Sequence, residues 1–262
     1  MKKILSLLLI PTLMFSFFAF TNDSEAALTG AFLQDTTNTA DLTTYTFASQ
    51  NLGTADTDRC IIVIAISRKA GAAHTLSSAS IGGVSATIIQ NQNNQVTNSD
   101  TAAMFSAIVP TGTTGDIVVT WSTTVLRTAI MAYRVVGVDS CTTPYASAAS
   151  TASDPSVSLD VPAGGFAVGG GLSAAATTAT WTGLTENADA TLESFVTYSS
   201  ASANFASESL STTMTLDFVS STETAGVFAS WGEPSAPVVT DSAQLFINYG
   251  KFKIDNGKII VD

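Results

Sequence analysis

The sequence predicts an all-β protein: an antiparallel β-sandwich of jelly-roll type that ends in a short hairpin. Apolar and polar residues alternate over short runs such as 117–121, 129–134, 213–219 and 225–231, as expected for strands that face a core. Glycine and proline turn signals separate these runs at short intervals. After residue 27 no segment carries a sustained helical stripe with capping residues, so many short strands are expected to build a sandwich or barrel.

Residues 1–26 have the pattern of a secretory signal peptide. Two lysines precede an apolar run over residues 4–20, and Ser24 and Ala26 supply the small side chains that a signal peptidase prefers. We expect cleavage after Ala26, with Ala27 as the alternative. An uncleaved membrane anchor is the competing interpretation, which the proline within the run and its modest length disfavour. The protein is therefore expected to be secreted or displayed at a cell surface, and the short dilysine start is typical of bacteria.

The charge balance argues against several classes of partner. The chain has 10 Lys and Arg against 21 Asp and Glu, a net charge of −11, and only 12% charged residues. Nucleic-acid binding needs clustered cations that displace counterions from phosphates, and no such cluster is present. Anionic membrane surfaces are disfavoured for the same reason, and no second apolar run approaches spanning length. We expect no nucleic-acid partner, no membrane span after signal cleavage, and a hydroxyl-rich surface typical of extracellular β proteins.

The two cysteines of the chain, Cys60 and Cys141, are predicted to form a disulfide. Cys60 precedes the apolar run 61–66, and Cys141 follows the run 129–138. If these runs are neighbouring antiparallel strands, the start of one lies beside the end of the other. Two buried, reduced thiols are the alternative, and a metal site built on the two cysteines is disfavoured because the chain has a single histidine.

The sandwich is expected to form one domain over residues 27–232, with two similar halves at about 44–138 and 156–231. Four phrases recur in the same order at offsets between 96 and 105 residues: 62–65 with 167–170, 80–84 with 180–184, 117–121 with 214–218, and 128–133 with 224–229. This order indicates an internal duplication, although chance similarity between strands is the alternative. A duplication would produce either one jelly-roll sandwich or two tandem sandwiches. The short junction at 147–155 favours a single domain.

Residues 233–262 are predicted to be a linker and a C-terminal β-hairpin. The segment 233–237 contains two prolines and is expected to be stiff. Asn256-Gly257 between two alternating runs is a strong hairpin signal, because both turn positions need positive φ. An isolated hairpin is only marginally stable in water. It should therefore dock either on its own sandwich or on a neighbouring subunit.

No catalytic constellation is recognisable. His74 would have to serve any Ser-His-Asp system, and no Gly-x-Ser-x-Gly motif is present, so we expect an exposed and inert loop histidine. Carboxylates that a glycosidase would need can be paired, such as Glu186 with Asp189 or Glu193, but nothing in their setting singles them out. The protein is therefore not expected to be an enzyme, and no cofactor is expected.

Two weaker ligand contacts are conceivable. Asp56 and Asp58 supply alternating carboxylates as in half of a calcium loop, but the rest of an EF-hand spacing is missing and Arg59 offers a competing ion pair, so a solvated turn is the default. Trp181 and Tyr198 are weak candidates for stacking on a ligand such as a sugar ring. For Trp181, which lies between threonines and before a glycine, burial in the core is the favoured alternative.

Several phrases carry a likeness to known domains: 52–59, 80–87, 109–119 and 180–186. Together they resemble uncharacterised β-sandwich domains of marine bacteriophage virion proteins and of secreted bacterial surface proteins, over about 180 residues. The resemblance implies a structural or surface-attachment role and carries no site residues. The signal peptide departs from a virion protein, which is assembled in the cytoplasm, and so favours a bacterial surface or filament component.

The functional prediction is a secreted, non-catalytic structural or adhesive protein that assembles with copies of itself into a filament or virion-like particle. The C-terminal hairpin or the segment 27–44 would pair with the sheet edge of a neighbour, since an added strand can complete a sheet through backbone hydrogen bonds alone. The alternative is an extracellular carbohydrate-binding module that contacts surface glycans.

Overall fold

The computed structural model describes residues 28–175, 177–194, 196–219 and 223–234, and the backbone of three short strands between residues 246 and 261. The predicted signal peptide lies outside the described residues. Every regular element described is a β-strand, and neighbouring strands pair antiparallel, which confirms the predicted fold class. Within the described part of the chain, no helix is long and apolar enough to cross a membrane.

The first half of the molecule consists of an inner and an outer sheet. The inner sheet has the strand order β1-β9-β3-β7-β6, with β1 (Thr29–Asn38), β9 (Arg127–Val136), β3 (Cys60–Ala70), β7 (Asn98–Ile108) and β6 (Thr87–Gln95). The outer sheet has the order β2-β8-β4-β5, with β2 (Leu42–Asn51), β8 (Thr114–Val125), β4 (Leu76–Ile81) and β5 (Val84–Ser85). Consecutive strands β1 to β4 therefore alternate between the two sheets.

The second half repeats this plan, and all but one of its strands are shorter than their counterparts. Its inner sheet has the order β10-β17-β12-β15-β14, with β10 (Ala146–Ser150), β17 (Thr224–Trp231), β12 (Phe166–Ser173), β15 (Val196–Asn204) and β14 (Thr185–Glu193). Its outer sheet has the order β11-β16-β13, with β11 (Ser156–Val161), β16 (Ser209–Phe218) and β13 (Ala179–Thr182). Strand by strand, this is the order of the first half without a counterpart of β5.

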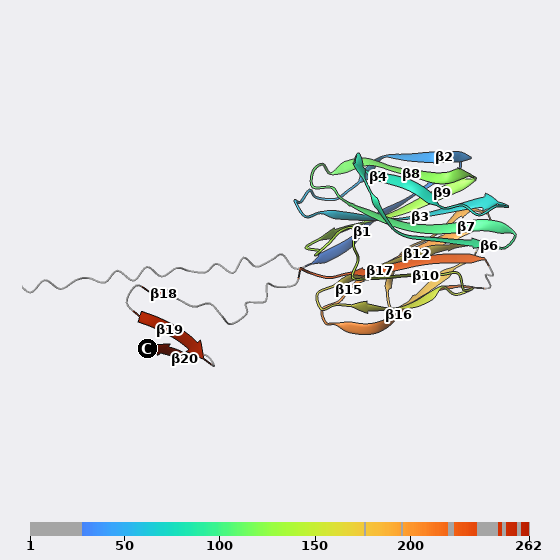
Figure 1. Cartoon of the computed structure of the whole chain (residues 1–262). Coiled ribbons are helices and arrows are strands. Elements are labelled where there is room, and N and C mark those ends of the chain that lie inside the picture. Colours follow the sequence, from blue (N-terminus) through green and yellow to red (C-terminus); the bar gives the residue numbers. More distant parts are fainter. Residues whose placement is uncertain are drawn as a thin grey trace, which may run out of the picture.

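The three C-terminal strands form a small sheet of their own, with β18 (Phe246–Ile247), β19 (Gly250–Asp255) and β20 (Lys258–Val261). β19 and β20 pair antiparallel with Asp255 opposite Lys258, as the predicted hairpin requires. The turn residues 256–257 lie outside the described residues. Figure 1 shows β19 and β20 apart from the larger sheets.

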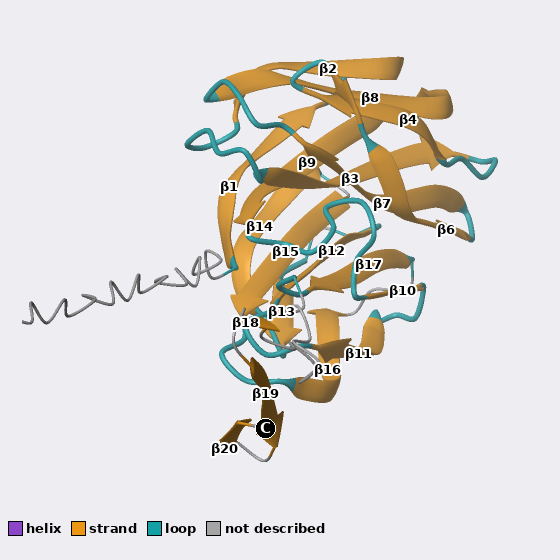
Figure 2. Ribbon diagram, turned by 60° about the vertical axis from the view of Figure 1, so that its left-hand side comes forward, coloured by secondary structure: helices purple, strands orange, loops and turns teal. Residues whose placement is uncertain are grey.

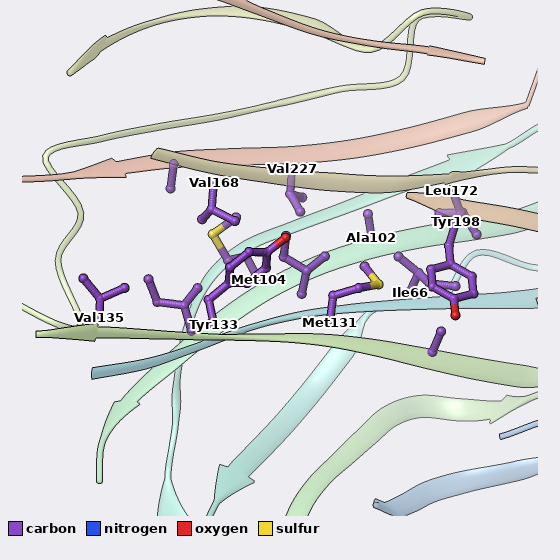
Figure 3. Packing of buried hydrophobic residues seen from close by; sticks show 14 of the residues in the cluster. Ile66, Ala102, Met104, Met131, Tyr133, Val135, Val168, Leu172, Tyr198 and Val227 are labelled. Carbon is purple, nitrogen blue, oxygen red and sulfur yellow. The ribbon is translucent and has the colours of Figure 1, made fainter. Parts of the chain in front are cut away.

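The four larger sheets stack as layers in the order outer, inner, inner, outer (Figures 1 and 2). A separate apolar cluster fills each of the three spaces between adjacent layers. In the central space, Met104, Met131 and Tyr133 of the first half face Val168 and Val227 of the second (Figure 3). Because the central cluster contains residues of both inner sheets, the two halves share this part of the core.

This layering explains two kinds of strand in the sequence. β3 lies in an inner sheet, and its residues alternate between the central cluster (Ile62, Ile64) and the cluster of the first half (Ile61, Val63), so the strand is apolar throughout. β8 lies in an outer sheet and alternates strictly, with buried side chains at every second position from 117 to 121. A continuous apolar run therefore marks an inner strand, and alternation marks an outer strand.

The likeness between the halves extends from strand order to individual hydrogen bonds. All four phrases paired in the sequence fall on strands that hold equivalent places, namely β3 and β12, β4 and β13, β8 and β16, and β9 and β17. The β7 residue Thr101 donates a hydrogen bond to the carbonyl of His74 at 2.8 Å, and the β15 residue Thr197 donates to that of Thr177 at 3.0 Å. Each bond ties down the loop that follows the central strand of its half. The jelly-roll classification and an origin by duplication stay predictions.

The boundaries of the halves differ from those predicted. The ranges 44–138 and 156–231 leave out β1 and β10, and most of β10 lies in the supposed junction 147–155. Both strands are edge strands of inner sheets and contain few large apolar residues, which explains why they were missed. In addition, β1 pairs with β9 of the same chain, so this part of the segment 27–44 already completes its own sheet.

The predicted disulfide between Cys60 and Cys141 is confirmed, with an S–S distance of 2.05 Å. β3 and β9 are antiparallel neighbours, and Cys60 lies opposite Val135 near the end of β9. The residues after β9 turn back over the start of β3, which brings Cys141 to its partner. The disulfide thus holds the connection between the halves in place at one end of the central space between the inner sheets.

Three consecutive glycines, Gly169 to Gly171, lie in the middle of β12, where both faces are covered. A Cβ atom on Gly171 would lie 2.3 Å from the carbonyl oxygen of Ala225 and 3.0 Å from the Cα of Gly226. Because these obstacles are backbone atoms, no rotamer change can relieve the clash. We expect Gly171→Ala to lower the free energy of unfolding by about 1–3 kcal/mol, measured by urea denaturation. Ser158→Ala, at an exposed position of β11, is the control, and equal stability of both variants would contradict this packing.

Candidate functional site

His74, the only histidine of the chain, is buried rather than exposed, so the prediction of an exposed loop residue is wrong. It does lie in a loop, between β3 and β4, but only 2% of its surface is accessible. Its Nε2 lies 2.6 Å from the Ser67 hydroxyl and its Nδ1 2.9 Å from the Ser99 hydroxyl, and its ring packs edge-on against Trp121. These two hydroxyls satisfy the ring, so it can be buried. Burial lowers the pKa of His74 to about 4, with a smaller contribution from Lys69.

Asp56 and Asp58 lie in the turn before β3, as the solvated-turn interpretation requires. The Asp56 carboxylate accepts a hydrogen bond from the Asp58 N–H at 3.1 Å and lies 4.0 Å from the Arg134 guanidinium. The expected ion pair with Arg59 is wrong: Arg59 is fully buried and donates to the carbonyls of Gly53, Val109 and Thr111. Among the described residues, no group of three or more His, Cys, Asp or Glu could hold a metal ion. Calcium at Asp56 and Asp58 stays a prediction.

The aromatic candidates Trp181 and Tyr198 are not brought together, because they lie on opposite sides of the second inner sheet. Tyr198 is 2% exposed and lies in the central cluster (Figure 3). Its hydroxyl donates a hydrogen bond to the Asp35 carboxylate of β1. Trp181 is half-buried on the other side, packs edge-on against Phe228, and donates from Nε1 to the Ser199 hydroxyl at 2.8 Å. Both rings therefore contribute to the interior.

The carboxylates Glu186, Asp189 and Glu193 all belong to β14, and each has a different setting. Asp189 accepts a hydrogen bond from the N–H of Ala179 at 3.1 Å, and Glu193 forms an ion pair with Arg127 of the first half. Partial burial raises the pKa of Glu186, and Asp189 adds to this effect. Asp189 and Glu193 thus hold strands and halves together.

A groove of about 490 Å³ lies at the end of the stack that carries the disulfide. Three chain segments form it: the connection between the halves, the turn between β11 and β12, and the residues that follow β17. Its lining residues are Asp139, Ser140, Thr143, Pro144, Tyr145, Pro162, Ala163, Trp231, Gly232, Glu233 and Pro234. The connection between the halves thus forms one wall. The turn between β11 and β12, together with residues 231–234, forms the other.

The groove is held in shape by bonds to the interior. The carbonyl of Cys141, beside the disulfide, accepts hydrogen bonds from the Ser106 hydroxyl at 2.7 Å and from Trp231 Nε1 at 3.4 Å. The N–H of Asp139 donates to the carbonyl of Gly232 at 2.9 Å and links the two walls. A site that is formed in advance loses little conformational entropy on binding.

The chemistry of the groove suits a ligand with apolar surface and positive charge. Tyr145 is 58% exposed, and Pro144, Pro162 and Pro234 provide further apolar surface. The carboxylates of Asp139 and Glu233 lie on the exposed rim. Glu233 accepts a hydrogen bond from the N–H of Leu28 at 2.9 Å, so the start of the described chain also lies here. The site offers a ring face, rigid walls and negative charge.

A cluster of charged side chains lies near the end of β3 that is opposite the disulfide. Asp100 is fully buried and faces the Arg68 guanidinium at 3.8 Å, with Arg127 and Glu223 nearby. Neither carboxylate oxygen of Asp100 accepts a hydrogen bond from a described residue. Burial raises the pKa of Asp100 to about 7 although both arginines oppose the shift. Because Arg127 pairs with Glu193, this cluster joins the two halves.

Comparison with models of protein families, with curated proteins and with solved structures found no match for this chain. The resemblance to virion and surface β-sandwich domains therefore stays a prediction.

Sequence reasoning missed the groove and its most exposed ring, Tyr145. Its walls come from segments almost 100 residues apart, around residues 140 and 232, so no local motif marks it. One signal was present: Pro144-Tyr145 follows Cys141 closely, so a large aromatic residue lies next to a covalent anchor in a connecting segment.

Proposed function

We propose that the protein is an extracellular, non-catalytic structural or adhesive subunit that assembles with copies of itself. The observation that carries this proposal is the combination of a rigid, disulfide-braced stack with a preformed groove at the end from which the chain leads to its C-terminal strands. Such a body has a fixed shape and an attachment surface, which are the properties that a structural subunit needs.

A structural role is also supported by the buried polar side chains, because they form hydrogen bonds and ion pairs within the stack. His74, Arg59 and Asp100 are the residues most suited to chemistry by their burial, and each lies within the hydrogen bonds or ion pairs of the stack. His74 lies beside Ser67, the eighth residue of β3, roughly 25 Å from the end of that strand that carries the groove. Extracellular location is supported by the disulfide, which persists in oxidising compartments.

The assembly is tested with the purified mature protein in its oxidised form. Negative-stain microscopy and light scattering over a hundredfold range of concentration are expected to reveal rings or filaments whose mass grows with concentration. Uniform monomers at every concentration would contradict self-assembly.

Glycan binding is the second candidate function, and Tyr145 favours it specifically. An exposed ring beside carboxylates and the hydroxyls of Ser140 and Thr143 is a combination that stacks on and hydrogen-bonds a sugar. A glycan array probed with and without calcium tests this function. Binding that Tyr145→Ala abolishes would support it, and an array without signal in either condition would count against it.

A further inference from the structure

We propose that the groove at the disulfide end accepts the C-terminal hairpin, β19 and β20, of a second copy of the chain. This inference rests on the proposed self-assembly and names the two surfaces that meet. It concerns the rim residues Asp139, Tyr145 and Glu233 on one copy and the segment 250–261 on the other.

The chain leaves the stacked sheets at the groove, on its way to the C-terminal strands. Pro234 lines the groove and is the last residue before the linker 235–245, so every copy carries its tail beside its own groove. Pro234 and Pro237 flank the first two linker residues in the sequence, and prolines make a linker stiffer. Eleven residues separate Pro234 from β18, and a chain of this length can span up to roughly 35 Å, which is enough for the hairpin to reach the groove of a neighbour.

Charge complementarity is the second argument. The groove rim carries the exposed carboxylates of Asp139 and Glu233. Of the four lysines after residue 27, three lie in or next to the hairpin strands: Lys251, Lys253 and Lys258. In a chain of net charge −11, two copies repel each other on average, whereas a cationic tail and an acidic groove attract each other.

The strand register provides the third argument. Phe252 lies opposite Val261, and Ile254 lies opposite Ile259. Residues two apart on a strand share a face, so this hairpin is expected to have one apolar face and one lysine-bearing face. An isolated hairpin is marginally stable in water. Docking against the ring of Tyr145 and the proline walls would cover the apolar face.

The geometry of such a contact determines the kind of assembly. Groove and hairpin are different surfaces, so the contact is heterologous, and each copy has one of each. Heterologous contacts repeat from copy to copy and produce rings if they close, or filaments if they do not. This agrees with a structural subunit.

The test uses three full-length variants. The tail variant carries Lys251→Glu, Lys253→Glu and Lys258→Glu, and the groove variant carries Asp139→Lys and Tyr145→Ala. The control variant carries Asp217→Lys and Leu210→Ala on β16, where Leu210 is 66% exposed and Asp217 is also exposed. Thermal unfolding of each variant establishes that the body remains folded, which is expected because the substituted side chains of the groove are exposed.

Sedimentation velocity then measures assembly of each variant and of their mixture. The tail and groove variants alone are each expected to associate at least tenfold more weakly than wild type, and the control variant is expected to match wild type. An equimolar mixture of tail and groove variants should form dimers but nothing larger, because the intact tail of one variant fits the intact groove of the other and growth then stops.

The possible failures are distinguishable. Wild type that stays monomeric contradicts the proposed self-assembly and this inference together. Wild type that assembles while both variants assemble equally well overturns this inference alone. Unchanged assembly of the groove variant with loss of binding on a glycan array would assign the groove to a sugar and would also overturn it.

Discussion

Reducing the Cys60–Cys141 disulfide is expected to lower the free energy of unfolding by about 4 kcal/mol. The bond closes a loop with a sequence separation of 81 residues, and a loop of this size loses much conformational entropy in the unfolded chain when it is crosslinked. The cysteines also anchor the connection between the halves, so the reduced protein should lose part of the groove wall before it unfolds completely.

The measurement is urea unfolding of the oxidised and the reduced wild-type protein, followed by tryptophan fluorescence. The reduced protein is itself the matched control, because both sulfur atoms remain and no cavity is created. A double variant, Cys60→Ala with Cys141→Ala, should be less stable still, because each alanine leaves unfilled volume in the central layer. Equal midpoints for oxidised and reduced protein would contradict the expectation.

The second large effect is a pH dependence in which two buried groups oppose each other. The pKa of Asp100 is raised to about 7, so the folded state holds this proton more tightly than the unfolded state, and stability is lost as the pH rises through about 7. The pKa of His74 is lowered to about 4, so the folded state binds this proton more weakly, and stability is lost as the pH falls from about 6.5 toward 4. From pH 5 to pH 9, linkage predicts that Asp100 lowers the free energy of unfolding by about 3 kcal/mol. Over the same range, His74 raises it by about 2 kcal/mol.

Wild-type stability should therefore change little over this range on account of these two groups. Asp100→Asn removes the stability loss that Asp100 causes at higher pH and leaves the contribution of His74. The free energy of unfolding of this variant should therefore rise by about 2 kcal/mol from pH 5 to pH 9, relative to a chain without either group. His74→Asn should show the opposite slope, a fall of about 3 kcal/mol over the same range.

Urea unfolding at pH 5, 6, 7, 8 and 9 yields these slopes, which are independent of any constant loss that a substitution causes. The groups that face Asp100 are Arg68, Arg127 and Glu223, and Lys69 is the charge that acts on His74, so none of these should be altered in the same experiment. Asp217→Asn, at an exposed position, is the control and should follow wild type. Parallel curves for Asp100→Asn and wild type would contradict a buried carboxyl with a raised pKa.

Short-range sequence patterns predict much of the fold. The run 61–66 marks β3, the alternation at 117–121 marks β8, and Gly82-Gly83 marks a tight turn between β4 and β5, where both residues have positive φ. These signals work because strand periodicity, turn chemistry and cysteine pairing each depend on few neighbouring residues. The predicted strands, hairpin and disulfide therefore agree with the structure.

The sites follow a different rule. His74 and Arg59 looked like exposed polar residues, yet both are buried, because hydroxyls and carbonyls from other strands satisfy their hydrogen bonds. Tyr145 was unremarked, yet it is the most exposed ring of the groove. Burial of a polar side chain depends on partners that lie far away in the chain, so composition alone does not reveal it.

The amino-acid sequence was thus sufficient for the all-β class, most of the strand positions, the cysteine pair and the likeness between the halves, since all of these depend on local periodicity or on counting. The number of layers, the shared central core, the groove and the buried Asp100 became visible only once the chain was folded. They arise where sheets from opposite halves come face to face, and the free energy of that contact belongs to pairs of surfaces rather than to any segment.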